Sequence, residues 1–254
     1  MPASSGARSS HLVLSGLLCA ITLAAAPPAP AAAGWLRGIF AAHLGAAHKA
    51  PVVSRYAVDS GGEFTLDSST AEPLLKFQDR FEVFALSPSR GPRGDTIYWN
   101  DVGQPLLRAT RLGGMTVFTP RRPEGAAASL AGPGAPLRIS TIGVASLYSR
   151  LIQAAARSTR AAGHTIAFDA PNADPGSDGL TADAAFVASE AIVLMASRPG
   201  GRLGLAKLLR VRIEPGKEVE AQYRDGMLRI IIDPRAGYAG RPSSLRIARL
   251  VGAR

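Results

Sequence analysis

The sequence of 254 residues contains a single cysteine, Cys19, which lies inside an apolar run near the N-terminus. If that run is removed after export, the mature chain has no thiol. This would exclude disulfide bonds, cysteine nucleophiles and thiolate metal sites. Aromatic residues make up only 6% of the chain, so a nucleic acid would find few side chains for base stacking, and we expect no dedicated nucleic-acid site. The mature fold must therefore be held by its hydrophobic core alone.

The first 33 residues have the composition of a secretory signal peptide. Residues 1–11 carry Arg8 and no acid, residues 12–25 are almost entirely apolar, and small residues follow. The apolar run is too short to span a bilayer comfortably, and cleavage after Ala31 or Ala33 is favoured. Lipoprotein processing at Cys19 is the alternative, but Leu18 stands where that processing needs a small residue. We expect export to the periplasm or the outside of a bacterial cell.

Acidic residues are scarce relative to basic ones, and the formal net charge is +10. Residues 1–33 contain Arg8 and no acid, so the mature chain keeps a formal charge of +9. Such a charge favours anionic partners, although a generally arginine-rich composition explains it equally simply. Beyond the signal peptide no run is suited to span a membrane. Residues 182–196 come nearest but include Asp183 and Glu190.

The apolar pattern predicts an α+β protein with an N-terminal antiparallel β meander, as a small barrel or half-sandwich, followed by helices packed on a three-stranded antiparallel sheet. Turn-rich pieces separate six expected strands: residues 64–66, 74–77, 81–86, 96–99, 106–109 and 115–118. Proline, glycine and alanine are abundant between them and the helices, which indicates a linker. The predicted regions are a signal peptide (1–33), a helix and β-rich domain (34–120, with the helix over 35–48), a linker (121–136), and a helical domain with a β-hairpin and basic tail (137–254).

The first helix after the predicted linker is expected to start at a cap formed by Ser140 or Thr141 and to end at Gly163. Its apolar face is expected to carry Val144, Leu147, Leu151, Ile152 and Ala155. A second helix is expected over residues 181–197, with Thr181 as its cap and Asp183 in its first turn. This helix is apolar almost all round, so we expect it at the centre of the core. A short third helix is expected over residues 203–208.

Asp225 and Gly226 form the strongest local signal, because this dipeptide suits a two-residue hairpin turn that needs positive φ at both positions. Folding there pairs apolar residues on one face: Tyr223 with Leu228, Ala221 with Ile230, and Val219 with Ile232. Residues 209–213 are expected to supply the third strand of this antiparallel sheet. Residues 242–244 can start a short helix near the C-terminus.

No recognised catalytic or metal motif is present, and we expect no metal and no cofactor. His43 and His48 are spaced for different faces of a helix, and His164 has no second ligand nearby. Residues 174–179 resemble the start of a calcium loop but lack its later ligands, so a polar surface loop is the better interpretation. Ser146 lacks the glycine-flanked turn of a serine nucleophile.

Three carboxylates are candidates for acid–base chemistry: Asp95, Asp101 and Glu190. A turn in which Asn100 and Asp101 bond their own backbone is favoured over a catalytic role. Glu190 is most simply the exposed edge of its helix, but if it is enclosed it needs a partner such as an arginine.

The C-terminal tail carries the main charge asymmetry, because no acid follows Asp233. Its candidate anion-binding residues are Arg235, Arg241, Arg246 and Arg249. Such a cluster can bind phosphate or carboxylate groups, and a simply solvated basic tail is the alternative.

Six segments carry a resemblance to a known family: residues 64–67 (FTLD), 74–77 (LLKF), 91–95 (GPRGD), 100–103 (NDVG), 107–114 (LRATRLGG) and 238–244 (YAGRPSS). In these segments the chain resembles a set of uncharacterised exported alphaproteobacterial proteins, the domain of unknown function 4908. The resemblance implies a bacterial envelope setting. It implies no activity, and no catalytic residue is carried over from it.

These observations favour a non-enzymatic, envelope-associated binding protein for an anionic component or a protein partner. Export, positive charge and the absence of a catalytic motif support this hypothesis. The alternative is a hydrolase that acts on envelope material through Asp95, Asp101 or Glu190. The enzyme hypothesis requires those carboxylates to converge in one pocket. No oligomeric state follows from the sequence.

Overall fold

The computed structural model describes residues 50–252. The predicted signal peptide with Cys19, the expected helix over residues 35–48, and both His43 and His48 lie outside these residues. The described residues all belong to one compact unit, Ala47–Arg254. This unit contains two hydrophobic cores, one inside a nine-stranded sheet and one between helices and a four-stranded sheet.

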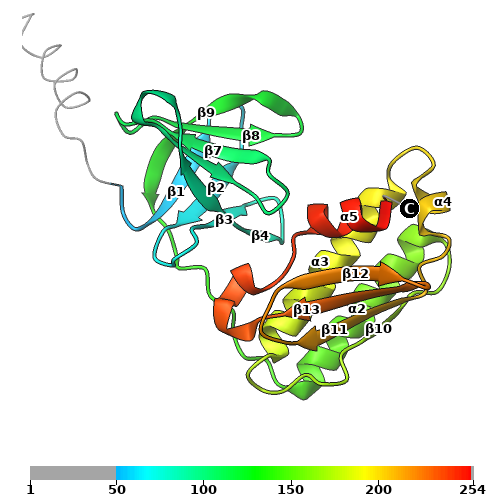
Figure 1. Cartoon of the computed structure of the whole chain (residues 1–254). Helices are drawn as coiled ribbons and strands as arrows, with labels where there is room; N and C mark the ends of the chain where they lie inside the picture. Colours follow the sequence, from blue (N-terminus) through cyan, green and yellow to red (C-terminus); the bar gives the residue numbers. More distant parts are fainter. Residues whose placement is uncertain (1–49, 253–254) are drawn as a thin grey trace, which may run out of the picture. The chain divides into compact units, whose positions relative to one another are not determined.

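The N-terminal sheet is antiparallel and has the strand order β4-β3-β2-β1-β9-β8-β7-β6-β5. Its two edge strands are separated in sequence only by Leu86, so the sheet curls until it is nearly closed as a barrel (Figure 1). The strands are β1 (Val53–Val58), β2 (Glu63–Asp67), β3 (Leu74–Phe77), β4 (Val83–Ala85), β5 (Ser87–Arg90), β6 (Thr96–Trp99), β7 (Pro105–Ala109), β8 (Met115–Thr119) and β9 (Arg122–Pro133), with the short 3-10 helix η1 (Pro92–Gly94) between β5 and β6. All six strands predicted from the sequence are present.

Alternating apolar residues fill the interior of this sheet, as expected for strands with one buried face. Phe64 and Leu66 of β2 point inward, and the Phe64 ring stacks on Tyr56 of β1 with 5.1 Å between ring centres. The strand prediction missed β1, β5 and β9. Every residue of β5 is exposed, so β5 has no apolar alternation to identify it.

The prediction of a linker over residues 121–136 is wrong. Most of that segment is strand β9, which lies between β1 and β8 near the middle of the sheet. At Gly125 of this strand, neighbouring side chains leave room for glycine alone. A Cβ at Gly125 would lie 2.6 Å from the Thr116 side chain. Small residues in a strand therefore mark a close packing position, not a flexible connection.

The true connection is residues 134–143, and buried carboxylates hold it at both ends. Asp67 accepts a hydrogen bond from the Leu137 backbone N–H at 2.8 Å. Asp178 accepts one from the Gly143 N–H at 2.7 Å, next to the start of helix α2. Since both acids are almost fully enclosed, these backbone N–H groups supply hydrogen bonds that the buried carboxylates need.

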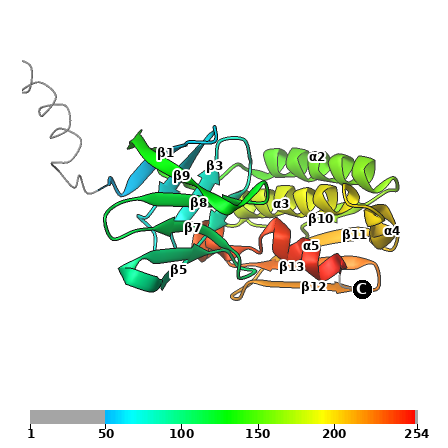
Figure 2. The same ribbon diagram turned by 90° about the horizontal axis from the view of Figure 1, so that it is seen from above.

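The C-terminal half contains helices and a four-stranded sheet of order β10-β11-β13-β12. The elements are α2 (Val144–Ala162), β10 (Ala167–Asp169), α3 (Asp178–Ala196), α4 (Gly201–Leu205), β11 (Arg210–Pro215), β12 (Glu220–Arg224), β13 (Met227–Ile232), η2 (Pro234–Gly240) and α5 (Ser244–Gly252). Helices cover one face, with α2 against β10, α3 against β11 and β13, and α5 against β12 (Figure 2). The fold is α+β, as predicted.

The predicted three-stranded antiparallel sheet is corrected in one respect: the sheet has four strands and is mixed. The β12–β13 hairpin is antiparallel, with Tyr223 opposite Leu228 and Ala221 opposite Ile230, as predicted. However, β11 pairs with β13, not with β12, and the pairing is parallel. The strand with most buried side chains, β13, takes the interior position, while the more polar β12 lies at the edge.

The helix faces also differ from prediction. In α2 the buried residues are Leu147, Leu151, Ala154, Ser158 and Ala162, whereas Val144 and Ile152 are exposed. The buried face of α2 is therefore rotated about the helix axis relative to the predicted face. Part of it consists of the small residues Ala154, Ser158 and Ala162, which apolar periodicity does not identify. No side chain caps α2: its N-cap is Gly143, and Gly163 ends the helix with φ of 82° as predicted.

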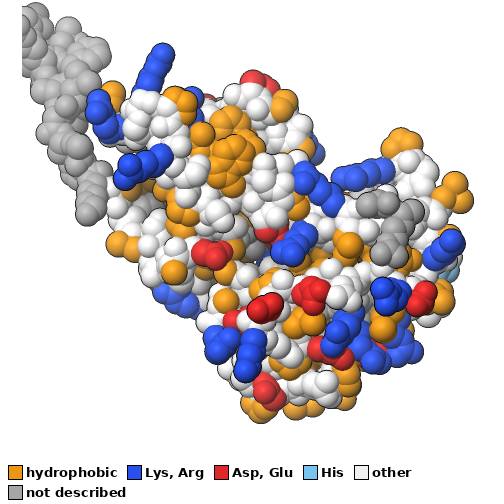
Figure 3. All heavy atoms as spheres, in the orientation of Figure 1, with side chains coloured by type: hydrophobic (Ala, Val, Ile, Leu, Met, Phe, Trp, Pro, Cys, Tyr) orange, Lys and Arg blue, Asp and Glu red, His pale blue; other side chains and the backbone are white. Residues whose placement is uncertain are grey.

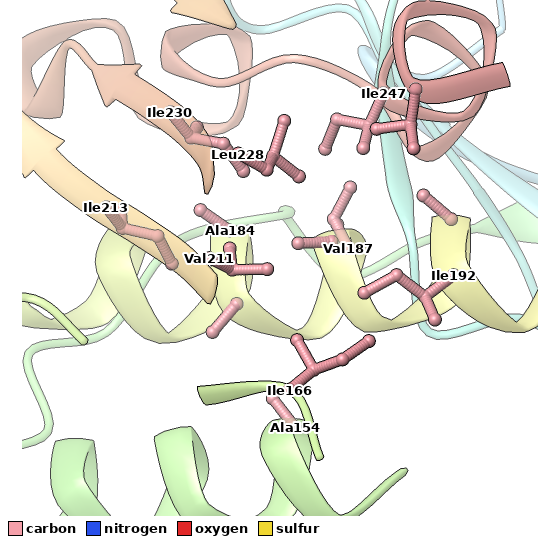
Figure 4. Close-up of a cluster of buried hydrophobic side chains, with 14 of the residues drawn as sticks. Ala154, Ile166, Ala184, Val187, Ile192, Val211, Ile213, Leu228, Ile230 and Ile247 are labelled. Atoms are coloured by element: carbon pink, nitrogen blue, oxygen red, sulfur yellow. The ribbon is translucent and has the colours of Figure 1, made fainter. Parts of the chain in front are cut away.

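Helix α3 begins at Asp178, so the prediction that Thr181 caps it is wrong; Thr181 is fully buried within the helix. As expected, α3 occupies the centre of the core, where it lies between the sheet residues Val211 and Leu228 and the α2 residue Ala154 (Figure 4). Among residues 50–252 it is the one helix long and apolar enough to cross a membrane, but 61% of that stretch is buried inside the protein. Its composition is that of a core helix.

Candidate functional site

The turn between β3 and β4 places two neighbouring residues in opposite environments. Phe81 keeps 88% of its surface exposed, whereas Glu82 keeps only 6%. A large exposed aromatic side chain contributes little apolar burial to the stability of the fold. A buried carboxylate costs free energy unless it has hydrogen-bond or charged partners. This contrast directs attention to what surrounds the turn.

Glu82 belongs to a buried polar cluster that we call the Arg241 cluster, formed by Arg241, Asp183, Glu82 and Ser244. The Arg241 guanidinium pairs with the Asp183 carboxylate and lies 3.8 Å from that of Glu82. It also donates to the backbone oxygen of Val83 at 3.0 Å. Because β4 is an edge strand, this bond satisfies a carbonyl that the sheet leaves unpaired.

Ser244 holds the other side of Glu82. Its backbone N–H donates to Glu82 Oε1 at 2.9 Å, and its hydroxyl donates to Oε2. Since Ser244 is the first residue of α5, the carboxylate also lies at the positive end of that helix. Burial raises the pKa of Glu82 above its ordinary value, while the positive charge of Arg241 opposes that rise. Both carboxylate oxygens of Glu82 thus accept hydrogen bonds within the protein, which indicates a structural role for this residue.

A cleft of about 560 Å³ adjoins this cluster, and we call it the phenylalanine cleft. Its apolar walls include five of the eight phenylalanines of the chain: Phe77, Phe81, Phe84, Phe118 and Phe186. Leu106, Val187, Leu194 and Leu245 complete the apolar lining. On α3 the lining residues Asp183, Phe186, Glu190 and Leu194 recur at helical spacing, so one face of the helix forms one wall.

Most charges at the phenylalanine cleft are paired. Glu190 of α3, whose side chain is 35% exposed, forms an ion pair with Arg157 of α2. Arg80 lies 5.4 Å from the centre of the Phe77 ring. Within residues 50–252, no carboxylate lies within ion-pair distance of the lining residues Arg80 or Arg198. On the face of the molecule shown in Figure 3, basic side chains are interspersed with acidic, hydrophobic and uncharged ones.

The tail arginines do not form one cluster. Arg241 is enclosed in the Arg241 cluster, with 2% of its side chain exposed, so it offers no surface to an external anion. Arg235 pairs with Asp233 in its own turn, and Arg249 of α5 donates to the backbone oxygen of Val102 at 2.8 Å. Arg246 lies on the same helix. Its backbone N–H donates a hydrogen bond to the Ser243 hydroxyl oxygen at 3.1 Å, and within residues 50–252 no carboxylate lies within ion-pair distance of its side chain.

The candidate carboxylates do not converge. Asp95 is buried beside Arg108, whose side chain donates to it at 2.7 Å. Asp101 accepts a hydrogen bond from the Ser243 N–H at 2.8 Å. Only Glu190 of the three lines the phenylalanine cleft. Asn100 accepts from the backbone of its own turn, as predicted.

The other candidates, His164 and the loop at Asp174, form hydrogen bonds within the protein. The His164 Nε2 lies 2.8 Å from the backbone oxygen of Leu208. Asp174 and Ser177 bond each other across the loop before α3, consistent with a polar loop. Among the residues that the structure describes, no group of three histidine, cysteine or acidic side chains is arranged to hold a metal ion.

Sequence reasoning missed Glu82, Arg241 as a buried residue, and the phenylalanines of the cleft. The lining residues come from β3, the β3–β4 turn, β4, β7, β8, α2, α3 and α5, so no local motif joins them. The one usable signal was Phe81-Glu82, an aromatic and an acid placed in what looked like the start of a strand.

A comparison with protein families finds one match: the model of the family described as Domain of unknown function (DUF4908) matches residues 37–251. No curated protein and no solved structure matches the chain.

Proposed function

The chain belongs to this family of unknown function, and we propose that it is an exported, non-enzymatic binding protein of the bacterial envelope. Its ligand is an anionic amphiphile, whose apolar part lies in the phenylalanine cleft. The observation that carries the proposal is the cleft itself, an aromatic-lined cavity of about 560 Å³ with the largely exposed Phe81 at its lining.

The apolar lining supports an apolar ligand part. Phe81 is 88% exposed in the free protein, so a ligand that covers it removes apolar surface from water. The β3–β4 turn that carries Phe81 is anchored at Glu82, which keeps the ring at the cleft without burying it. A pre-positioned aromatic residue loses little conformational freedom on binding.

The charges support an anionic ligand. Arg241 engages the acids Glu82 and Asp183, and Arg157 engages Glu190. Arg157 balances the charge of Glu190, whereas Arg241 supplies one positive charge to the two carboxylates Glu82 and Asp183. Arg80 and Arg198 line the cleft without a carboxylate partner among residues 50–252, whereas Asp79 is the lining acid without a basic partner there. The formal charge of the whole chain, +10, attracts the same class of ligand.

The hydrolase alternative has weaker support. It needs two carboxylates free to exchange protons with a substrate. Asp95 and Asp101 lie outside the cleft, and Glu190 is bound to Arg157. Both oxygens of Glu82 are engaged by Ser244.

Calorimetric titration with n-decyl phosphate, kept below its micelle-forming concentration, tests the proposal. Phe81→Ala should weaken binding by about tenfold or more, because burying a phenylalanine side chain contributes about 1.5–3 kcal/mol. Leu112→Ala is the matched control, since Leu112 is a 93% exposed apolar residue that does not line the cleft. Equal weakening in both variants, or no binding by the natural chain, would contradict the proposal.

The envelope setting has its own test. The chain from Gly34 onward should sediment with isolated bacterial envelope fractions, and a salt series reports the kind of contact. A steep loss of binding as salt rises supports an anionic envelope component, because exposed charges are screened. Retention at high salt supports a protein partner that offers an apolar surface, and absence of binding contradicts both.

Export is tested by the mass of the protein recovered from cell fractions. We expect a chain that begins at Ala32 or Gly34 in the periplasm or the medium. Recovery of a chain that still contains residues 1–33 from the cytoplasm would contradict export.

A further inference from the structure

A second hollow of about 520 Å³ adjoins the phenylalanine cleft. The two cavities share the lining residues Phe81, Asp183 and Phe186. The other residues of the second hollow are Arg138, Ile139, Ser140, Ile142, Arg150, Gln153, Gly179, Ala182 and Tyr238. The two cavities therefore adjoin at these side chains.

The second hollow is basic. Arg138 comes from the connection before α2, and Arg150 comes from α2 itself. Asp183 is the single acid that lines it, and Arg241 already engages that carboxylate. Arg138 forms an ion pair with the buried Asp67, so the positive charge at the hollow that has no acidic partner is that of Arg150.

Arg150 has the greater capacity for a new partner. Its guanidinium lies 5.7 Å from the centre of the Phe186 ring, which positions it at the junction of the two cavities. In the described part of the chain no carboxylate lies within ion-pair distance of Arg150. A guanidinium with free N–H groups next to an aromatic face suits a phosphate or carboxylate oxygen.

Arg138 and Tyr238 of the second hollow are held in place by hydrogen bonds within the protein. Arg138 donates to Ser69 Oγ at 2.9 Å and lies 3.4 Å from Asp67, so its guanidinium is held in place. Burial raises the pKa of Tyr238, and its hydroxyl, which donates to the Arg138 backbone oxygen at 3.4 Å, stays protonated. Ser140 and Gln153 supply further polar groups at the same hollow.

We propose that the second hollow binds the oxyanion of an amphiphilic ligand, with Arg150 as its main contact, while the alkyl part occupies the phenylalanine cleft. This inference rests on the proposed function and adds the position of the charged group. The shared chemistry is a terminal phosphate or carboxylate on an alkyl chain, whether it belongs to a lipid or to a smaller metabolite.

The test compares two probes with the same alkyl chain, the anionic n-decyl phosphate and the uncharged n-decyl maltoside, by calorimetric titration. Arg150→Gln should weaken decyl phosphate binding by about tenfold and change decyl maltoside binding by less than about twofold. Arg160→Gln is the matched control, because Arg160 is an exposed arginine of the same helix that lines neither cavity. Phe81→Ala should weaken both probes.

Each outcome is decisive. Unchanged decyl phosphate binding in Arg150→Gln, or equal weakening of both probes, overturns the assignment of the oxyanion to Arg150 and leaves the proposed function intact. Failure of the natural chain to bind either probe overturns the proposed function together with this inference. Decanoate and dioleoylphosphatidylglycerol vesicles, titrated in parallel, distinguish a free small anion from a lipid head group. Equal urea midpoints for both arginine variants establish that folding is unchanged.

Discussion

Arg241 and Asp183 lie 58 residues apart in the sequence and form an ion pair in which the arginine side chain is 98% enclosed, with 2% of its surface exposed. The pair joins the segment before α5 to the second turn of α3. Glu82, from the β3–β4 turn, completes the cluster, so three distant parts of the chain depend on one guanidinium.

Arg241→Met should destabilise the protein by about 3–5 kcal/mol, because it leaves the buried Glu82 and the partly buried Asp183 without their counter-charge. Urea unfolding followed by circular dichroism measures the loss. Arg235→Met is the control: Arg235 pairs with Asp233, but 72% of its side chain is exposed, so no measurable loss is expected. Adding Glu82→Gln and Asp183→Asn to Arg241→Met should restore part of the stability. A similar small effect in both single variants would contradict the buried-pair interpretation.

Asp67 should make stability depend on pH. Burial by itself raises the pKa of Asp67, but hydrogen bonds from Ser69 and Leu137 outweigh burial, so the pKa lies below its ordinary value. An acid with a lowered pKa stabilises the folded state above the ordinary carboxyl pKa of about 4 and loses that contribution as pH falls through the lowered value. Asp67→Asn should therefore cost about 1–3 kcal/mol at pH 7, and the difference should shrink below about pH 4.

The measurement is urea unfolding of the natural chain and the Asp67→Asn variant at several pH values. Asp59→Asn serves as the control, because Asp59 lies in an exposed turn between β1 and β2. A constant difference between natural and Asp67→Asn proteins over the whole pH range would show that the carboxylate charge is not the source of the stabilisation.

Gly226→Ala should weaken the β12–β13 hairpin. Gly226 has φ of +77°, and a Cβ there would lie 2.7 Å from the Lys207 backbone oxygen. Both the backbone conformation and the contact disfavour a side chain, so we expect a loss of at least about 1 kcal/mol. Gly204→Ala is the matched control, since a Cβ at this helical glycine meets no atom within 4 Å. In thermal unfolding, the midpoint temperature of Gly226→Ala should be clearly lower than that of Gly204→Ala. The reverse order would contradict the turn geometry.

Ile230→Ala should lower the free energy of unfolding by about 2–5 kcal/mol, because the Ile230 side chain of β13 is fully buried in the core between the sheet and the helices. Its neighbour Ile231 points to the other face of the sheet and is only half-buried. Ile231→Ala should therefore cost clearly less, as measured by urea midpoints. Equal costs would show that the two faces of β13 are buried to the same extent.

Local residue patterns were sufficient for the elements whose formation depends on nearby residues. The Asp225-Gly226 turn has φ of 48° and 77°, which confirms the turn that the dipeptide predicted. The hairpin register followed from that turn and from alternating apolar residues. The six predicted strands, the core position of α3 and the end of α2 at Gly163 were confirmed for the same reason.

Long-range packing decided the rest. Residues 121–136 have the composition of a linker, yet most of them form β9, because β1 and β8 provide pairing partners on both sides that only the folded sheet supplies. The parallel placement of β11 beside β13 depends on which strand buries most apolar surface against the helices. The five phenylalanines and the buried Arg241 come together only when remote segments meet, because burial and charge compensation are properties of three-dimensional neighbours, not of sequence neighbours.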